Sequence, residues 1–314
     1  MIDFLFPIKW LVEAILVVFH AAFTAIGLDP ASGLVWVLSI VGLTIVVRAS
    51  LIPIFVKQII SQRNMLVVQP ELQKLQKKYK GRNDPESRRE FAEAQMALYK
   101  KHNTNPIASC LPLLIQMPIF SGLFFVLNDA QSNKAGVGFM DQALATQFSQ
   151  ASFFGAPLKE TFLTSASLEV KILAATMIIL MTASQFITQK QILAKNQNPA
   201  VMTSQYMQTQ KIMLYVFPII FAISGISFPL GVMFYWLTSN FWTMGQQYVV
   251  IRKMPTPGST AYKQMMDRMA RKAERKGQPL PGSITAAEIM IDEADPVSPQ
   301  RVQPVGKKRA KKKK

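Results

Sequence analysis

The most constraining feature of the sequence is an apolar run at 34–56, LVWVLSIVGLTIVVRASLIPIFV, which contains a single charged residue, Arg48. A helix of this length is about 34 Å long, and the hydrocarbon core of a bilayer is about 30 Å thick. The run therefore predicts a membrane-spanning helix. Four further apolar runs predict an all-α membrane protein with a five-helix transmembrane core, whose remaining spans lie at about 106–127, 170–189, 212–228 and 230–251.

Arg48 is the unusual residue of this first span, and Thr44 precedes it by one helical turn on the same face. The cost of an arginine at the bilayer centre is put between roughly 3 and more than about 10 kcal/mol, so such a residue is retained where it faces water or a partner. One interpretation is that Arg48 snorkels to the inner interface. Since eight residues separate it from the end of the run, we favour a water-filled pocket within the membrane.

Basic residues gather in three sections outside the apolar runs. Half of the 314 residues are hydrophobic, yet the formal net charge is +17. In a soluble domain this balance would indicate nucleic-acid binding. Here 30 of the 35 Lys and Arg residues fall in 57–105, 190–211 and 252–314, which share one side of the membrane if the five spans cross in order. Because basic loops are retained inside the cell, we predict that all three are cytoplasmic.

Residues 1–33 are predicted to form an N-terminal helix and a linker. The apolar segment 4–26 is interrupted by Lys9, Glu13 and His20, and glycine and proline follow it. It fits a signal-like anchor, a spanning helix or a helix that lies in the membrane interface. We favour the interfacial helix, because Lys9 and Glu13 would be costly deep in lipid.

Section 57–105 has the pattern of a helical hairpin inserted into the five-span core (34–251). Its first arm carries an apolar stripe at spacings of three and four, and Pro70 is expected to kink or start this arm. Residues 81–83 break the helix, and Asp84 followed by Pro85 predicts the N-cap and first residue of a second arm. Two amphipathic arms of this length predict an antiparallel hairpin.

Polar residues in the later spans recur at helical spacing. Span two places Gln116 on one face with three other positions, and this face suits either a hydrated cavity or contact with another helix. Span five carries one polar stripe and a second set beside it. The stripe consists of Tyr235, Thr238, Ser239, Trp242 and Gln246, and the second set consists of Trp236, Asn240 and Thr243.

The remaining sections are predicted to be loops and a tail. Residues 128–167 are rich in Gly, Ser, Gln and Asn and predict a loop, and only a tight turn fits between spans four and five. From 252 to 314 the apolar periodicity ends and the chain finishes in KKRAKKKK. We expect one short helix at 260–276 and disorder in the rest of this tail.

The composition gives no indication of an enzyme. Cys110 is the only cysteine and the chain has two histidines, so no metal-ligand cluster is apparent. The sequence contains neither a glycine-rich phosphate loop nor a nucleophile elbow. We therefore expect neither catalysis nor a cofactor nor a metal.

Three segments resemble one known family in order and spacing. NPIASCLPLLIQMPIF (105–120), FPLGVMFYWLTSNFWTMGQQYVV (228–250) and VRASLIPIFVKQ (47–58) resemble the YidC family of membrane-protein insertases, in its bacterial form without a large extracytoplasmic domain. Prolines and amide side chains at fixed places in apolar helices rarely match by chance, so the resemblance is specific to this family. The resemblance covers about 34–251.

The resemblance implies insertion of newly made proteins into the membrane through a hydrophilic groove that is open to the cytoplasm and to lipid. The residues that match the family's groove positions are Arg48, Thr44, Gln116, Gln185, Tyr235 and Trp236. The implied location is the bacterial plasma membrane, and the implied partners are nascent membrane proteins, with the general secretion channel and targeting factors as further partners.

The basic tail predicts an anionic partner. We favour contact with ribosomal RNA over contact with anionic lipids, because the charge at this terminus exceeds what orientation requires. The residues expected to make this contact are Lys307, Lys308, Arg309, Lys311, Lys312, Lys313 and Lys314. A different class stays open at this stage: a small transporter or channel in which Arg48 is an anion site.

Overall fold

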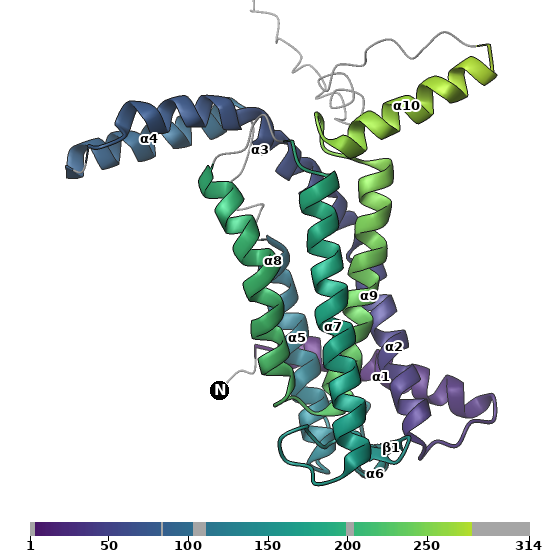
Figure 1. The fold of residues 1–314 in the computed structure, drawn as a ribbon. Helices are drawn as coiled ribbons and strands as arrows, with labels where there is room; N and C mark the ends of the chain where they lie inside the picture. Colours follow the sequence, from purple (N-terminus) through teal and green to yellow (C-terminus); the bar gives the residue numbers. More distant parts are fainter. Residues whose placement is uncertain (1–3, 83, 103–110, 199–203, 278–314) are drawn as a thin grey trace, which may run out of the picture. The chain divides into compact units, whose positions relative to one another are not determined.

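The computed structural model describes residues 4–82, 84–102, 111–198 and 204–277 (Figure 1). The basic residues at 307–314, the predicted tail disorder and Cys110 lie outside these ranges. The chain divides into two compact units, one up to Lys263 and one from Gln264 onward.

The described residues fold almost entirely as helices, which confirms an all-α membrane protein. By length and composition, α1, α2 and α7 can each cross a membrane. The only strands of the described ranges form one short antiparallel pair, in which Ser152 lies opposite Pro157. The elements are α1 (Phe6–Ala25), α2 (Gly33–Ser50), α3 (Ile52–Tyr79), α4 (Pro85–Lys101), α5 (Leu111–Gln131), α6 (Gln142–Gln150), β1 (Ser152–Phe153), β2 (Ala156–Pro157), α7 (Leu168–Lys195), α8 (Ser204–Gly225), α9 (Leu230–Lys253) and α10 (Thr260–Arg275).

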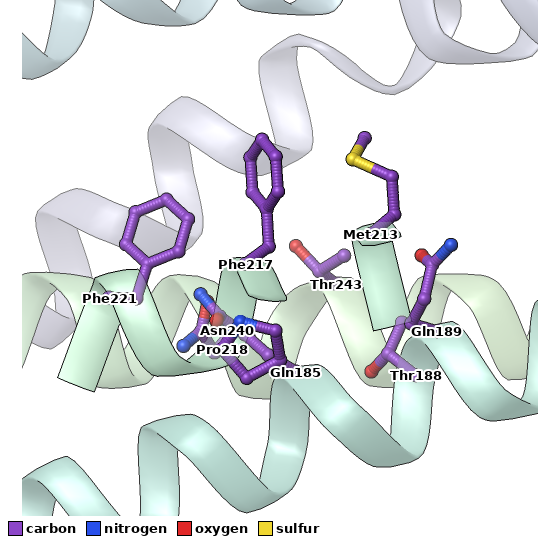
Figure 2. A pocket seen from close by; sticks show the side chains of 9 residues that line it. All are labelled: Gln185, Thr188, Gln189, Met213, Phe217, Pro218, Phe221, Asn240 and Thr243. Atoms are coloured by element: carbon purple, nitrogen blue, oxygen red, sulfur yellow. The ribbon is translucent and has the colours of Figure 1, made fainter. Parts of the chain in front are cut away.

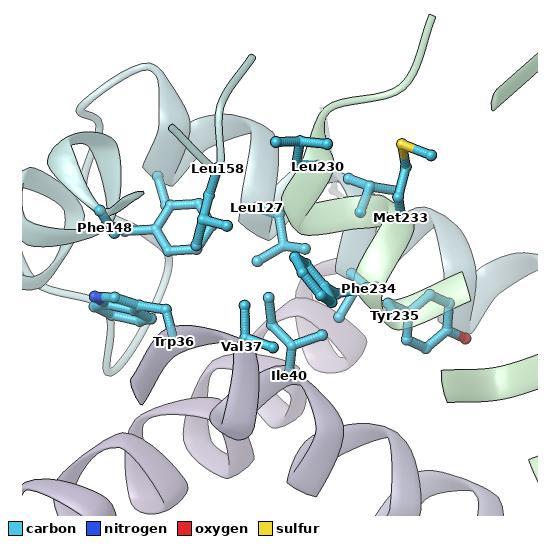
Figure 3. Packing of buried hydrophobic residues seen from close by; sticks show 14 of the residues in the cluster. Trp36, Val37, Ile40, Leu127, Phe148, Leu158, Leu230, Met233, Phe234 and Tyr235 are labelled. Atoms are coloured by element: carbon cyan, nitrogen blue, oxygen red, sulfur yellow. The ribbon is translucent and has the colours of Figure 1, made fainter. Parts of the chain in front are cut away.

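Five helices occupy the places of the predicted spans: α2, α5, α7, α8 and α9. Helix α9 packs against α2 and α7. The hydrophobic core lies where α9 begins, next to α6 (Figure 3). Trp36 of α2 is fully buried, and its ring lies 5.1 Å from that of Phe148 of α6. A Cβ on Gly33 would lie 2.2 Å from the Ser152 carbonyl oxygen, so β1 sits directly on the start of α2. This end of the bundle is therefore tightly closed.

The sequence predicts one continuous helix at 34–56, but in the structure the helix is interrupted at Leu51. Helix α2 ends at Ser50 and α3 begins at Ile52. Pro53 has no backbone N–H and cannot continue the hydrogen-bonding pattern of α2. Helix α3 then runs on to Tyr79 through residue 70, so Pro70 does not start the first arm of the hairpin.

Helices α3 and α4 form the hairpin. Val68, Leu72 and Tyr99 are buried between the two arms. Asp84 is the N-cap of α4, as the sequence predicts, and its carboxylate accepts a hydrogen bond of 2.7 Å from the Ser87 N–H. This hydrogen bond lowers the pKa of Asp84. The hairpin thus has a small apolar core and a capped turn.

Helix α1 is held by a buried carboxylate. The Glu13 side chain is 1% exposed and accepts hydrogen bonds from the backbone N–H groups of Val137 at 2.8 Å, Gly138 at 2.7 Å and Met140 at 3.3 Å. Figure 1 shows α1 running across the longer helices of the bundle. The favoured interfacial placement of 4–26 stays a prediction, since α1 is also long enough to span.

The section 128–167 contains ordered structure that the prediction of a loop missed. Helix α6 begins after Asp141, whose carboxylate accepts a 2.8 Å hydrogen bond from the Leu144 N–H. Its apolar face buries Ala145 and Phe148, three residues apart. By contrast, the helix predicted at 260–276 is confirmed as α10.

Candidate functional site

Arg48 lies in the last turn of α2, because the helix ends at Ser50. Its side chain is half-buried, and its Nε donates a hydrogen bond of 3.0 Å to the Ser239 Oγ of α9. A terminal guanidinium nitrogen donates to the same hydroxyl. Among the described residues Arg48 forms no ion pair with a carboxylate. The cation is therefore held by a neutral acceptor and by the carbonyl end of its own helix.

Tyr235 extends this site toward α5. It lies one helical turn before Ser239 on the same face of α9, and its hydroxyl accepts a 2.8 Å hydrogen bond from the Gln116 side-chain amide. Tyr235 is buried, whereas Gln116 is partly exposed. The structure thus places Arg48, Gln116 and Tyr235 along one polar line that joins α2, α9 and α5.

Thr44 and Trp236 lie beside this line and are not joined to it by hydrogen bonds in the described part of the chain. Thr44 is fully buried, and its hydroxyl donates to the Ile40 carbonyl at 2.7 Å. Trp236 belongs to an aromatic cluster in which its ring lies 5.0 Å from Phe221 and 5.4 Å from Phe228. Their assignment to the groove stays a prediction.

Gln185 lines a separate pocket of about 240 Å³ between α7, α8 and α9, in which polar side chains face apolar ones of α8 (Figure 2). The Asn240 side-chain nitrogen in this pocket is buried and has no hydrogen-bond partner among the residues that the structure describes. Asn240 and Tyr235 are about 140° apart around α9 at 100° per residue, so the two polar sites occupy different faces of this helix. The pocket's polar lining consists of uncharged side chains: Gln185, Thr188, Gln189, Asn240 and Thr243.

A largely apolar trough of about 550 Å³ begins within one helical turn of Arg48 and of Ser239 in the chain, although neither residue lines it. It lies between the start of α3 and the second half of α9. Its lining includes Ile52 and Val56, which follow Arg48 in the chain, and Trp242, which lies close to Ser239 on α9. A Cβ on Gly245 would meet no atom within 4 Å, so this part of the trough is open.

The structure adds two residues that the sequence prediction did not assign to the site: Ser239, which binds Arg48, and Gly245, which lines the trough. Ser239 was recognised in the polar stripe of span five, and its spacing of four from Tyr235 is the signal that places both on one face. Gly245 carried no such signal, because its role depends on the distance between two helices.

The fold and the site together define a class: a multi-pass membrane protein whose helices hold an arginine, without a carboxylate partner in the described ranges, beside an apolar trough. Comparison with known proteins gives the family. The family model described as 60Kd inner membrane protein matches residues 27–257. The chain belongs to this family, that of the YidC membrane protein insertases, and is an inner membrane protein.

Individual relatives agree with this assignment. A protein of Streptomyces avermitilis named membrane protein insertase YidC is 44% identical over 282 residues, which cover 87% of this chain and 63% of the relative. A protein of the same name from Tropheryma whipplei is 38% identical over 98% of this chain and 96% of its own length. A third, from Bifidobacterium longum, is 34% identical over 97% of this chain. These names do not favour the alternative of a transporter or channel.

Proposed function

We propose that this protein inserts newly made proteins into the bilayer and that the Arg48–Ser239 pair is the first contact of the polar substrate segment that must cross. The observation that carries the proposal is a guanidinium that has a neutral hydroxyl as its partner next to an apolar trough. The names of the relatives support the same activity.

The neutral partner makes Arg48 available to a substrate. A hydrogen bond that involves a charged group contributes a net of about 1.5–3 kcal/mol, so an acidic group of the substrate that pairs with the guanidinium can displace the Ser239 hydroxyl. Opposite charges 4 Å apart attract by about 4 kcal/mol at an effective dielectric constant of 20. This attraction is enough to hold a short acidic segment for a time and still release it.

The trough gives the apolar part of the substrate a place beside the polar one. Its walls on α3 and α9 are mostly apolar, with Gln246 and Lys253 as polar members, and they begin at Ile52, four residues after Arg48. A hydrophobic substrate helix can therefore lie in the trough while its acidic end contacts the guanidinium. The helix then leaves past α2 and α9 into lipid. Since the sequence contains no nucleotide-binding motif, burial of the substrate in lipid drives the step, assisted by the membrane potential.

The orientation and the further partners belong to the same proposal. The hairpin, the section 190–211 and the tail face the cytoplasm, because they hold most of the basic residues. The hairpin receives substrates or targeting factors, and the tail contacts ribosomal RNA. Labelling of single cysteines in intact cells tests the orientation, and a cysteine at an exposed hairpin position such as Glu86 should resist impermeant reagents.

Insertion by the purified protein is the direct test. Liposomes that contain the protein should protect the translocated end of a single-span substrate from added protease, and empty liposomes should not. Equal protection in both preparations would contradict the proposed function. Anion flux through the liposomes without any insertion would instead support a channel.

A further inference from the structure

Helix α10 separates apolar and charged residues onto two faces. At 100° per residue, the apolar side chains of Tyr262, Met265, Met266, Met269 and Ala273 fall within an arc of about 100°. Met269, near the middle of this arc, is 39% exposed, whereas Tyr262, Met265 and Met266 are partly exposed and Ala273 is buried. The charged residues of the helix are all exposed, and five are basic and two acidic: Lys263, Arg268, Arg271, Lys272, Arg275, Asp267 and Glu274.

The short segment between α9 and α10 is hydrogen-bonded to the end of α7. The Asn196 side chain, at the C-cap of α7, accepts a 2.8 Å hydrogen bond from the Thr256 N–H. Ser259 then caps α10 by accepting from the Tyr262 N–H at 3.2 Å. Helix α9 ends at Lys253, only six residues before this cap. Residues 254–263 belong to the same unit as α7 and α9.

We propose that α10 is an interfacial helix that binds the surface of an anionic phospholipid bilayer. Its methionines and Tyr262 enter the boundary between headgroups and acyl chains, and the basic residues contact phosphate groups. A basic amphipathic helix of this kind is suited to a membrane surface, and it follows directly after the membrane-spanning helix α9 in the chain. The proposal does not depend on the insertion activity.

The apolar face distinguishes a bilayer from RNA as the partner. An RNA would engage the charged face and leave the methionines in water, whereas a bilayer engages both faces. The charge excess gives the preference for anionic lipid, because each Lys or Arg near such a surface contributes roughly fivefold to binding, or about 1 kcal/mol. Neutralising three of them should therefore lower the ratio of bound to free helix on the order of 100-fold.

Spin labels on the full-length protein test this proposal. With Cys110 replaced by serine, Met269→Cys and Arg271→Cys place one label on each face of α10. The proteins are reconstituted into vesicles of phosphatidylcholine mixed with an equal amount of phosphatidylglycerol, and into vesicles of phosphatidylcholine alone. In the mixed vesicles the label at 269 should be accessible to oxygen and protected from a water-soluble nickel complex, and the label at 271 should remain accessible to nickel.

The triple variant Lys263→Gln, Arg271→Gln, Lys272→Gln, labelled at 269, provides the charge control. It should lose the protection at 269 in mixed vesicles at physiological salt. Equal nickel accessibility of both faces in both kinds of vesicle would overturn the proposal. Protection that appears only when ribosomes are added would overturn it as well and would assign α10 to RNA. Protection that is the same in both vesicles and unaffected by the triple change would refute the role of anionic lipid.

Discussion

Replacing Glu13 by glutamine should loosen the segment 136–140 while leaving the five-helix core folded. One carboxyl oxygen of Glu13 accepts from Val137, and the other accepts from Gly138 and Met140. An amide has only one acceptor oxygen, and in its better orientation it retains two of the three bonds. At least one N–H is then left without its acceptor, in the better orientation the partly buried N–H of Val137, and this costs up to about 1–3 kcal/mol.

Amide hydrogen exchange of the protein in nanodiscs measures this loss. A cost of about 1–3 kcal/mol corresponds to exchange that is roughly 5- to 150-fold faster at residues 137, 138 and 140. Glu86→Gln, an exposed change in the hairpin, should leave these amides unaffected. Glu13→Ala removes all three acceptors and should give a larger effect. If Glu13→Gln is folded and exchanges at the wild-type rate, the carboxyl does not hold this loop.

Three further predictions concern the trough and the hairpin. Gly245→Leu should reduce insertion by narrowing the trough, and Gly245→Ala should reduce it less; equal activity of the two variants and wild type in reconstituted vesicles would remove the trough from the mechanism. The hydrogen bond from Lys101 lowers the pKa of Glu71, so the contact at the hairpin base is fully present above the ordinary pKa of a glutamate, about 4.3, and is lost as the pH falls through the lower folded value. The amide hydrogen-exchange rates of Leu98 and Tyr99, divided by the rates of an unstructured peptide at the same pH, should rise at acid pH in the wild type. The Glu71→Gln variant should show no such rise, and an equal rise in this variant would contradict the role of the Glu71 carboxylate. Deleting 71–99 should abolish insertion while the protein still integrates into the membrane, and normal insertion by the deletion would refute a role for the hairpin.

Local sequence signals were sufficient for much of the fold. The turn between α8 and α9 was predictable because Pro229 interrupts an otherwise apolar run, and α9 begins at the next residue. The start of α4 followed from Asp84 and Pro85, since a carboxylate cap and a proline at the first position act within one turn. Such features depend on neighbours in the chain and are readable from it.

Features that depend on distant residues could not be predicted in this way. Arg48 and Ser239 are 191 residues apart, and only the packing of α2 on α9 brings them together. The interruption at Leu51 was missed, because the apolar run continues through it and prolines are tolerated in membrane helices. Likewise, the sequence could not show that Gln185 lines a pocket with residues of α8 and α9, and its assignment to the groove stays a prediction.

The most direct measurement of the central claim combines a change in Arg48 with a change in the substrate. Insertion rates are measured in reconstituted vesicles for wild type, Arg48→Lys and Arg48→Ala, each with a single-span substrate that has an aspartate or an asparagine in its translocated end. If Arg48 attracts the acidic end, Arg48→Ala should slow the aspartate substrate much more than the asparagine one, and Arg48→Lys should largely preserve insertion of both. An equal loss with the two substrates would show that Arg48 supports the fold and does not contact the cargo.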